Sequence, residues 1–154
     1  MAAKAKDVKN FLKTKQIDTK NIRVSTDSSI RVKLLDPYLD LEKIETILQE
    51  EFESYQRDEA TGEILSGGNT FVFVEYDWDL VKRVQEELHG TIKPFLEKCS
   101  GNWSIQLLVN HYLEQKLFDY NDQIIKRAVR ESFYSFFRHN ENENPNLKVE
   151  GWNI

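Results

Sequence analysis

The sequence predicts an α+β protein with a small antiparallel sheet of about three to four strands, helices packed on one face of that sheet, and a helical C-terminal half. Three observations lead to this fold class. Residues 21–35 alternate apolar and polar side chains around a central turn, which is typical of a β-hairpin. Residues 41–55 place apolar side chains every three or four positions, which is typical of an amphipathic helix. After residue 77 the helical spacing recurs in three segments, as expected when helices are segregated from a sheet.

Length and composition favour one folded domain. The chain has 154 residues, of which 40% are hydrophobic and 12% aromatic, and this content is typical of a protein with a packed core. A single cysteine, Cys99, excludes an internal disulfide and a multi-cysteine zinc site. No apolar run reaches the roughly 18 residues of a membrane span, and residues 1–10 lack the apolar centre of a secretory signal. We therefore expect an intracellular protein.

The charges are unevenly distributed along the chain. The net charge is −5, but residues 1–35 sum to +6, residues 36–79 to −11, and residues 80–154 to zero. A basic N-terminal segment therefore precedes a strongly acidic middle segment.

The first half contains the elements expected to form the sheet. A short amphipathic helix is predicted over residues 5–15, followed by the hairpin of residues 21–35. Pro37 ends the second strand of the hairpin. Asp40 is the expected N-cap of the amphipathic helix at residues 41–55. Residues 57–68 are expected to form a loop, with a short strand at 63–65. The β-branched and aromatic run of residues 70–76 predicts a strand covered on both faces.

The second half is expected to be helical. Helices are predicted from Asp77 to Cys99, from Trp103 to Phe118, and from Asp122, as the expected cap, to Phe137. In the first of them Gly90 is expected to break the helix, and Pro94 to restart or kink it. We interpret residues 1–154 as one domain with a helix-hairpin-helix-strand unit (5–76), a three-helix extension (77–139) and a tail (140–154). Apolar side chains are expected to dock the tail on the body: Leu147, Val149 and Trp152.

The hairpin resembles a known domain family. Its Arg23-Val-Ser-Thr-Asp27 segment is followed at once by Ser28-Ser-Ile-Arg-Val32, and residues 5–76 are similar in element order to the large polyvalent protein-associated domain, type twenty-nine. The resemblance implies a protein of a phage or another mobile genetic element, acting in the cytoplasm of a bacterial host cell. The role that it implies is inhibition of host defence, and it implies no catalytic residues.

No catalytic residue, metal site or cofactor is predicted. His111 and Glu114 form an isolated His-x-x-Glu pair, for which a structural role is expected. Cys99 lies at the end of an apolar helix and is expected to be an inert thiol. Glu75, Asp77 and Asp79 leave open the alternative of a magnesium-dependent nuclease. The simpler interpretation, which we favour, is that Asp77 caps a helix and Asp79 lies in its first turn.

The acidic segment supplies the first functional hypothesis, a non-enzymatic protein that binds a basic surface on a host protein. Glutamates along the helix from Asp40 to Glu53 and acidic residues of the following loop would form the contact surface. The candidate contacts are Glu42, Glu45, Glu50, Glu53, Asp58, Glu59 and Glu63.

The basic segment supplies an alternative, a nucleic-acid-binding module. Its candidate phosphate contacts lie in the N-terminal helix and in the hairpin: Lys9, Lys13, Arg23, Arg31 and Lys33. A homodimer is a further expectation, because the aromatic residues of the last helix cannot all face one core. Tyr134 or Phe137 would then form an exposed apolar patch.

Overall fold

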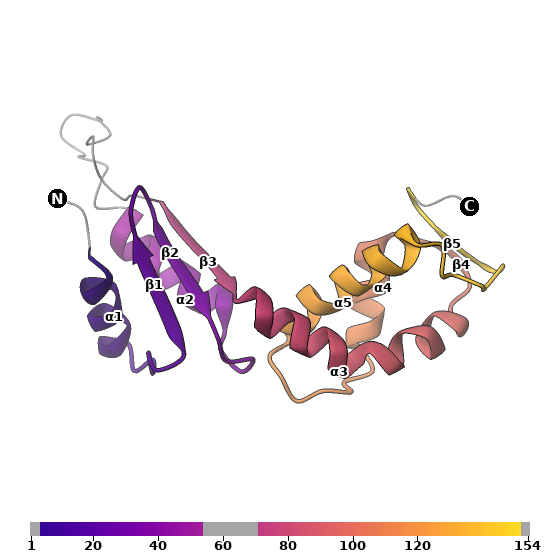
Figure 1. Cartoon of the computed structure of the whole chain (residues 1–154), viewed down its shortest axis with the longest axis horizontal. Coiled ribbons are helices and arrows are strands. Elements are labelled where there is room, and N and C mark those ends of the chain that lie inside the picture. Colours follow the sequence, from indigo (N-terminus) through magenta and orange to yellow (C-terminus); the bar gives the residue numbers. More distant parts are fainter. Residues whose placement is uncertain (1–3, 54–70, 152–154) are drawn as a thin grey trace. The chain divides into compact units, whose positions relative to one another are not determined.

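The computed structural model describes residues 4–53 and 71–151. The chain divides into two compact units, Met1–Asp77 and Trp78–Ile154, and each unit is described by itself. The α+β class is confirmed. Figure 1 labels the elements, which follow the chain in this order: α1 (Ala5–Thr14), β1 (Ile22–Thr26), β2 (Ile30–Leu34), α2 (Leu41–Leu48), a π-helical turn (Gln49–Glu53), β3 (Val72–Tyr76), α3 (Trp78–Glu97), β4 (Gly101–Trp103), α4 (Ile105–Leu113), α5 (Asp122–Arg138) and β5 (Leu147–Val149).

The first unit is a three-stranded sheet with the strand order β1-β2-β3. The predicted hairpin is confirmed, because β1 and β2 pair antiparallel with Val24 opposite Val32. The expectation of an antiparallel sheet fails for β3, which pairs parallel to β2 with Val32 beside Val74. The physical reason is the connection: a helix lies between β2 and β3 in the sequence, and a helical crossover returns the chain to the same end of the sheet.

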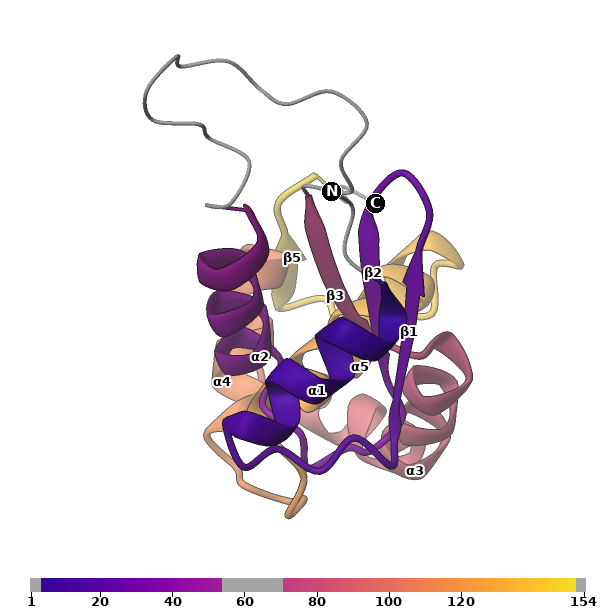
Figure 2. The same cartoon turned by 90° about the vertical axis from the view of Figure 1, so that its left-hand side faces the viewer.

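Two helices cover one face of this sheet. Helix α1 contacts β1 and α2, while α2 and the π-helical turn contact β3 (Figure 2). Val8 and Leu12 of α1 are fully buried, and Phe11 packs edge-on against Phe52 with ring centroids 5.7 Å apart. The sheet contributes alternate residues of its strands to this core: Ile22, Ile30, Val32, Leu34, Val72, Val74 and Tyr76.

Local capping explains where α2 begins. The Asp40 side chain accepts a hydrogen bond from the backbone N–H of Lys43 at 3.1 Å, as predicted for an N-cap. Beyond Leu48 the helix widens into a π-helical turn rather than continuing as α-helix. The predicted loop of residues 57–68, with its short strand at 63–65, lies outside the described residues.

The prediction that the third strand is covered on both faces is wrong. Val72, Val74 and Tyr76 are buried, but Phe71 and Phe73 are exposed. The reason is that α1 and α2 pack on the same face of the sheet. Alternate side chains of a strand point to opposite faces, so one half of an almost entirely apolar run remains uncovered.

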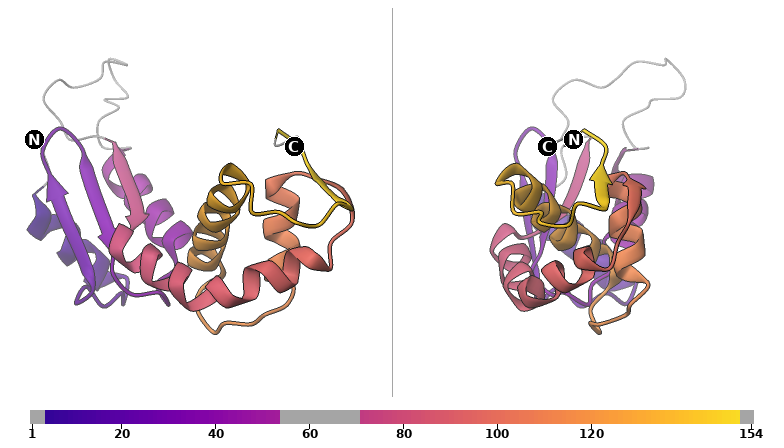
Figure 3. Two further views of the ribbon diagram at one scale, coloured as in Figure 1. Left: turned by 45° about the vertical axis from the view of Figure 1, so that its right-hand side comes forward. Right: turned by 90° about the vertical axis from the view of Figure 1, so that its right-hand side faces the viewer.

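The second unit is built from α3, α4 and α5 (Figure 3). Its core consists of apolar side chains from all three helices, with the rings of Phe95, Tyr112 and Phe133 in mutual contact. The hydroxyls of Tyr112 and Thr91 lie 2.5 Å apart, and Thr91 donates to the carbonyl of Leu88 at 2.6 Å. This chain of hydrogen bonds joins α4 to α3 inside the unit.

Helix α3 is continuous over 20 residues and contains Pro94, so the expected break at Gly90 is wrong. A proline ring approaches the carbonyl of the residue four positions earlier, which here is Gly90. Apart from its chain neighbours and the adjacent helix backbone, no heavy atom lies within 4 Å of the position that a Cβ on Gly90 would occupy. Seven apolar side chains of α3 are buried along one face and stabilise the helix on both sides of the proline.

The other two helices differ from prediction at their ends. Helix α4 stops at Leu113 instead of Phe118, because Lys116 takes a left-handed conformation (φ 50°) that ends helical structure, and Leu117 is exposed. Helix α5 begins at Asp122 with Asn121, not Asp122, as the cap; the Asn121 side chain accepts from the Gln123 N–H at 2.9 Å.

The tail forms a strand that the sequence analysis did not predict. Strand β5 pairs parallel to β4, with Gly101 beside Leu147 and Trp103 beside Val149. Leu147 and Val149 are buried, so these two residues dock as expected, whereas Trp152 lies outside the described residues. Strand β4 therefore lies in the segment that joins α3 to α4 and is part of a two-stranded sheet.

Candidate nucleic-acid interface

One face of the three-stranded sheet is not covered by α1 or α2. Strand alternation places seven residues on it, which together we call the open sheet face: Arg23, Ser25, Arg31, Lys33, Phe71, Phe73 and Glu75. All seven are exposed. The residues between them in the sequence face the helices, because a side-chain period of two sends neighbours to opposite sides.

The register of the strands arranges these side chains in rows across the sheet. Ser25 pairs with Arg31, which lies beside Phe73, and this forms one row. Arg23 pairs with Lys33, which lies beside Glu75, and this forms the next row. The three cations therefore lie on β1 and β2, whereas the aromatic residues and the carboxylate lie on β3.

Two phenylalanines occupy this face in unusually exposed positions. Phe71 is 60% exposed and Phe73 is 49% exposed. Phe71 precedes β3, but its carbonyl accepts a hydrogen bond from the Ile30 N–H at 2.8 Å, which extends the pairing with β2. The Arg31 guanidinium lies over the Phe73 ring, 5.2 Å from the centroid, in cation–π geometry. Adjacent exposed aromatic rings form an apolar patch of the kind that marks binding surfaces.

The structure separates the five residues that were predicted as nucleic-acid contacts. Arg23, Arg31 and Lys33 come together on the open sheet face. Lys9 and Lys13 lie on α1, which packs on the opposite face of the sheet; Lys9 is half-buried and Lys13 is exposed. A ligand on the open sheet face would therefore contact the hairpin cations without those of the helix.

Sequence reasoning missed Phe71 and Phe73 as candidate contacts. The signal was present, because the two phenylalanines alternate with Val72 and Val74 and therefore belong to one side of the strand. Apolar residues on both sides of this strand predict that both of its faces are buried. Only the placement of both helices on one face shows which of these apolar residues remain exposed.

The predicted acidic surface is only partly described. Glu42 and Glu50 are exposed on α2 and the π-helical turn, and Glu45 is half-buried. Glu53 accepts a hydrogen bond from the backbone N–H of Val72 through Oε2 at 2.9 Å, which fixes the π-helical turn to the start of β3. The other predicted members lie outside the described residues: Asp58, Glu59 and Glu63. Binding of a basic partner by this surface stays a prediction.

The candidate catalytic residues of the second unit are arranged as ordinary structural contacts. His111 Nδ1 lies 3.0 Å from Glu114 Oε2 in an exposed pair, and its ring stacks on Trp103 with centroids 5.2 Å apart. Cys99 is buried, its thiol is directed at the carbonyl of Phe95 at 3.4 Å, and burial raises the pKa of the thiol. A buried thiol with a raised pKa is a poor nucleophile at neutral pH.

No metal-binding cluster is found in residues 4–53 and 71–151: they contain no group of three histidine, cysteine, aspartate or glutamate residues that could hold a metal ion. Helix α3 begins at Trp78, so Asp77 directly precedes it and Asp79 lies in its first turn. Anionic side chains at these positions interact favourably with the helix dipole. The nuclease alternative gains no geometric support from these residues.

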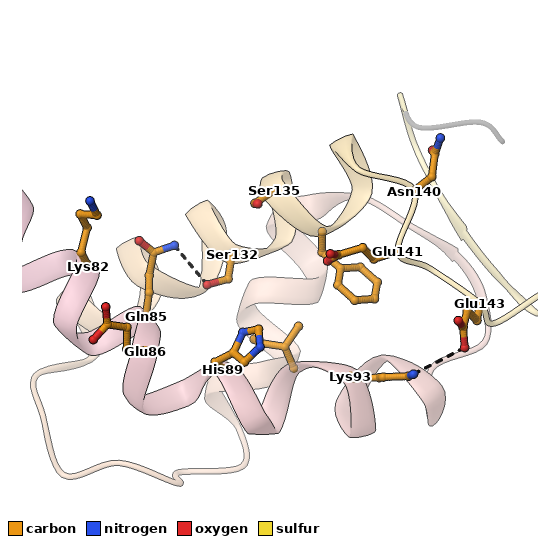
Figure 4. Close-up of a pocket in the computed structure, with 12 residues that line it drawn as sticks. Lys82, Gln85, Glu86, His89, Lys93, Ser132, Ser135, Asn140, Glu141 and Glu143 are labelled. Atoms are coloured by element: carbon orange, nitrogen blue, oxygen red, sulfur yellow. Dashed lines mark hydrogen bonds and ion pairs between the residues drawn. The ribbon is translucent and has the colours of Figure 1, made fainter.

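An open cleft of about 810 Å³ lies between α3, α5 and the segment after α5 (Figure 4). Gln85 donates to Ser132 across it at 3.3 Å, and Lys93 forms an ion pair with Glu143 at 3.5 Å. Cations and carboxylates both line the cleft, including Lys82 and Glu141. The lining therefore favours neither an anionic nor a cationic ligand.

Phe137 does not contribute to the expected dimerisation patch on the last helix, and the homodimer itself stays a prediction. Phe137 is only 2% exposed and packs in the core, one helical turn beyond the fully buried Phe133. Tyr134 and Phe136 are half-buried. Residues four apart on a helix share a face, so Phe133 and Phe137 enter the core together and Phe137 cannot serve as a surface contact.

Comparisons with family models, with curated proteins and with solved structures gave no match. The resemblance of residues 5–76 to the large polyvalent protein-associated domain, type twenty-nine, therefore stays a prediction. No helix within the described part of the chain combines the length and the apolar character needed to cross a membrane.

Proposed function

We propose that this protein binds nucleic acid through the open sheet face. One observation supports the proposal above all others: Arg31 lies beside Phe73, one of two exposed phenylalanines, and two further cations, Arg23 and Lys33, occupy the next row of the same face. Lysine and arginine side chains attract phosphates, and exposed aromatic rings stack on bases. A surface with both features side by side matches the two chemical parts of a nucleotide.

The charge of this surface differs from that of the whole chain. The protein carries −5 overall, but the open sheet face contains three cations and one carboxylate, Glu75. Arg23 and Arg31 each present a planar guanidinium that can bind a phosphate through two hydrogen bonds. At physiological ionic strength charges are screened beyond about 8 Å, so the local cations dominate an interaction at this face.

This proposal ranks above the binding of a basic host protein by the acidic surface. One predicted acidic contact, Glu53, is already engaged with the Val72 N–H, and Glu45 is half-buried. A solvated acidic helix face is common and needs no partner, whereas exposed phenylalanines on a sheet are unfavourable in water. An origin in a phage or mobile element and a role against host defence are compatible with nucleic-acid binding, and they stay predictions.

The proposal is tested by fluorescence anisotropy with labelled DNA and RNA oligonucleotides at several salt concentrations. We expect weak binding. The logarithm of the association constant should fall linearly with the logarithm of the salt concentration. A variant with Arg23→Gln, Arg31→Gln and Lys33→Gln should bind at least tenfold more weakly. Its salt slope should be smaller by about 2 on a single strand and by about 3 on B-DNA, because each lost phosphate contact removes about 0.7 or about 0.9, respectively.

The matched control is the double variant Lys9→Gln and Lys13→Gln. It removes two cations from the same unit, but from the helix on the covered face of the sheet. We expect its affinity to stay within about twofold of the unmodified protein. Equal losses in the two variants would mean that general charge attraction, not the open sheet face, binds the ligand. Absence of binding at low salt would refute the proposed function.

A further inference from the structure

We infer that the ligand of the open sheet face is a single strand of DNA or RNA, with its bases stacked on Phe71 and Phe73 and its phosphates over the hairpin cations. The inference rests on the proposed function and specifies it further. It follows from the positions of the aromatic residues, of the cations and of Glu75.

The two phenylalanines are far enough apart for each ring to stack on a separate base. They lie on the same side of one strand and are separated by one residue. Two residues of a β-strand span about 7 Å, which is twice the 3.4 Å rise per nucleotide of a stacked strand. Each ring therefore has room for a base of its own. Stacking does not require a particular base, because every base presents a π-face.

The cations lie to one side of the aromatic residues. Arg23 belongs to β1, and Arg31 and Lys33 belong to β2, while both phenylalanines belong to β3 or directly precede it. Neighbouring strands are about 4.8 Å apart, so Arg31 and Lys33 on β2 flank β3 directly, while Arg23 on β1 lies one strand farther away. A nucleotide has the same asymmetry, since its base projects sideways from the phosphate backbone. The backbone would therefore follow the hairpin while the bases lie over β3.

Glu75 supports this orientation. It follows Phe73 on the same face of β3 and lies beside Lys33 in the register of the sheet. A carboxylate at this position repels phosphates from β3 and leaves the hairpin as the favourable track for the backbone. On the base side its oxygens are acceptors for exocyclic amino groups, so it is compatible with bases but not with phosphates.

A duplex does not fit these features. In double-stranded DNA or RNA each base is already stacked on its neighbours and paired with its partner, so its faces are not free to contact Phe71 or Phe73. Binding of a duplex would use the cations alone and leave the exposed rings without a base to stack on. Recognition through aromatic stacking is characteristic of single strands and loops.

The test compares four labelled oligonucleotides of about ten positions by fluorescence anisotropy. They are a DNA strand, an RNA strand of the same sequence, the corresponding DNA duplex, and a DNA backbone of the same length with abasic sites throughout. The abasic strand keeps the phosphates and removes the bases. We expect the full-length protein to bind at least one of the two intact single strands at least tenfold more tightly than both the duplex and the abasic strand.

Variants of the rings test the stacking directly. The double variant Phe71→Leu and Phe73→Leu keeps apolar side chains on the sheet but removes the π-faces, and it should bind the intact strand no more tightly than the abasic strand. Phe73→Tyr keeps an aromatic ring and is the matched control, with an expected affinity within about threefold of the unmodified protein. Far-ultraviolet circular dichroism checks that each variant is folded.

The outcomes separate this inference from the proposed function. If the duplex and the abasic strand bind as well as the intact strands, or if the leucine variant keeps full affinity, then stacking is wrong while binding through phosphates stands. If no oligonucleotide binds at low salt, both the inference and the proposed function are wrong. The stronger of the DNA and RNA complexes identifies which nucleic acid the surface prefers.

Discussion

The guanidinium carbon of Arg31 lies 5.2 Å from the centroid of the Phe73 ring, and the two residues are direct neighbours on the parallel strands β2 and β3. This contact joins the cations of the open sheet face to its aromatic residues. It restrains a flexible cation against a short, rigid side chain, so less conformational freedom remains to be lost when a phosphate binds.

Arg31→Lys should separate charge from geometry at this contact. Lysine keeps the positive charge but lacks the planar, bidentate fork of arginine. We expect the affinity for a single-stranded oligonucleotide to fall severalfold while the salt slope remains unchanged, both measured by fluorescence anisotropy. An unchanged affinity would show that Arg31 acts only through its charge.

Glu53→Ala should loosen the start of β3. The Glu53 carboxylate accepts a part-buried hydrogen bond from the Val72 N–H at 2.9 Å, and its loss leaves that donor without this acceptor. We expect the free energy of unfolding to fall by about 1–3 kcal/mol. Hydrogen exchange at the Val72 amide should accelerate. Glu53→Gln keeps an acceptor oxygen, so its free energy of unfolding should fall by less. Equal decreases in the two variants would contradict a role for the hydrogen bond.

Tyr76→Phe should have a pH-dependent effect on stability. The Tyr76 hydroxyl donates to the carbonyl of Leu39 at 2.6 Å, and burial raises the pKa of the phenol well above its usual value. Near pH 7 the phenol keeps its proton in both the folded and the unfolded chain. The only difference is then the hydrogen bond that the variant lacks, so the variant should be less stable by about 1 kcal/mol. Above about pH 10 the unfolded chain ionises while the folded chain does not, which destabilises only the unmodified protein.

The difference between the unmodified protein and Tyr76→Phe should therefore shrink as the pH rises from 7 to 10.5. Urea unfolding followed by circular dichroism at both pH values measures it. Other ionisable groups are common to both proteins and cancel in the comparison. A difference that stays constant over this range would argue against a buried, protonated phenol.

Asn144→Ala should destabilise the second unit. The Asn144 side-chain amide donates to the carbonyls of Leu96 at 2.9 Å and Cys99 at 2.8 Å, at the C-terminal end of α3. Loss of these hydrogen bonds should lower the free energy of unfolding by about 1–3 kcal/mol. Asn146→Ala is the control, because Asn146 is exposed and its described hydrogen bonds use the backbone; its effect should stay within about 0.5 kcal/mol.

Tryptophan fluorescence during urea unfolding is a suitable measurement for the Asn144 variant. All three tryptophans of the chain, Trp78, Trp103 and Trp152, belong to the second unit. Equal midpoints for the Asn144 and Asn146 variants would show that the side chain does not anchor the tail.

Cys99 should react slowly with iodoacetamide in the folded protein. The thiol is buried, and burial raises its pKa, so little reactive thiolate is present at pH 7.5. Mass spectrometry measures the rate of labelling, which we expect to be at least 100-fold slower in the folded protein than in urea. Rapid labelling under native conditions would show that the end of α3 opens readily.

Much of the local structure follows from the sequence alone. Period-two alternation located the hairpin, because a half-buried strand needs one apolar face. Spacing of three and four located α1 and α2, and Asp40 was recognisable as a cap because its short carboxylate can accept from Lys43. These features depend on residues within a few positions of one another, so the sequence by itself determined them.

Other features depend on contacts between distant residues, and only the tertiary structure decided them. The parallel pairing of β3, the docking of β5 on β4 and the burial of Phe137 each require segments to meet that local patterns do not connect. The open sheet face is of the same kind. Residues 70–76 are apolar on both sides, and Phe71 and Phe73 are exposed because both helices pack on the face formed by Val72 and Val74.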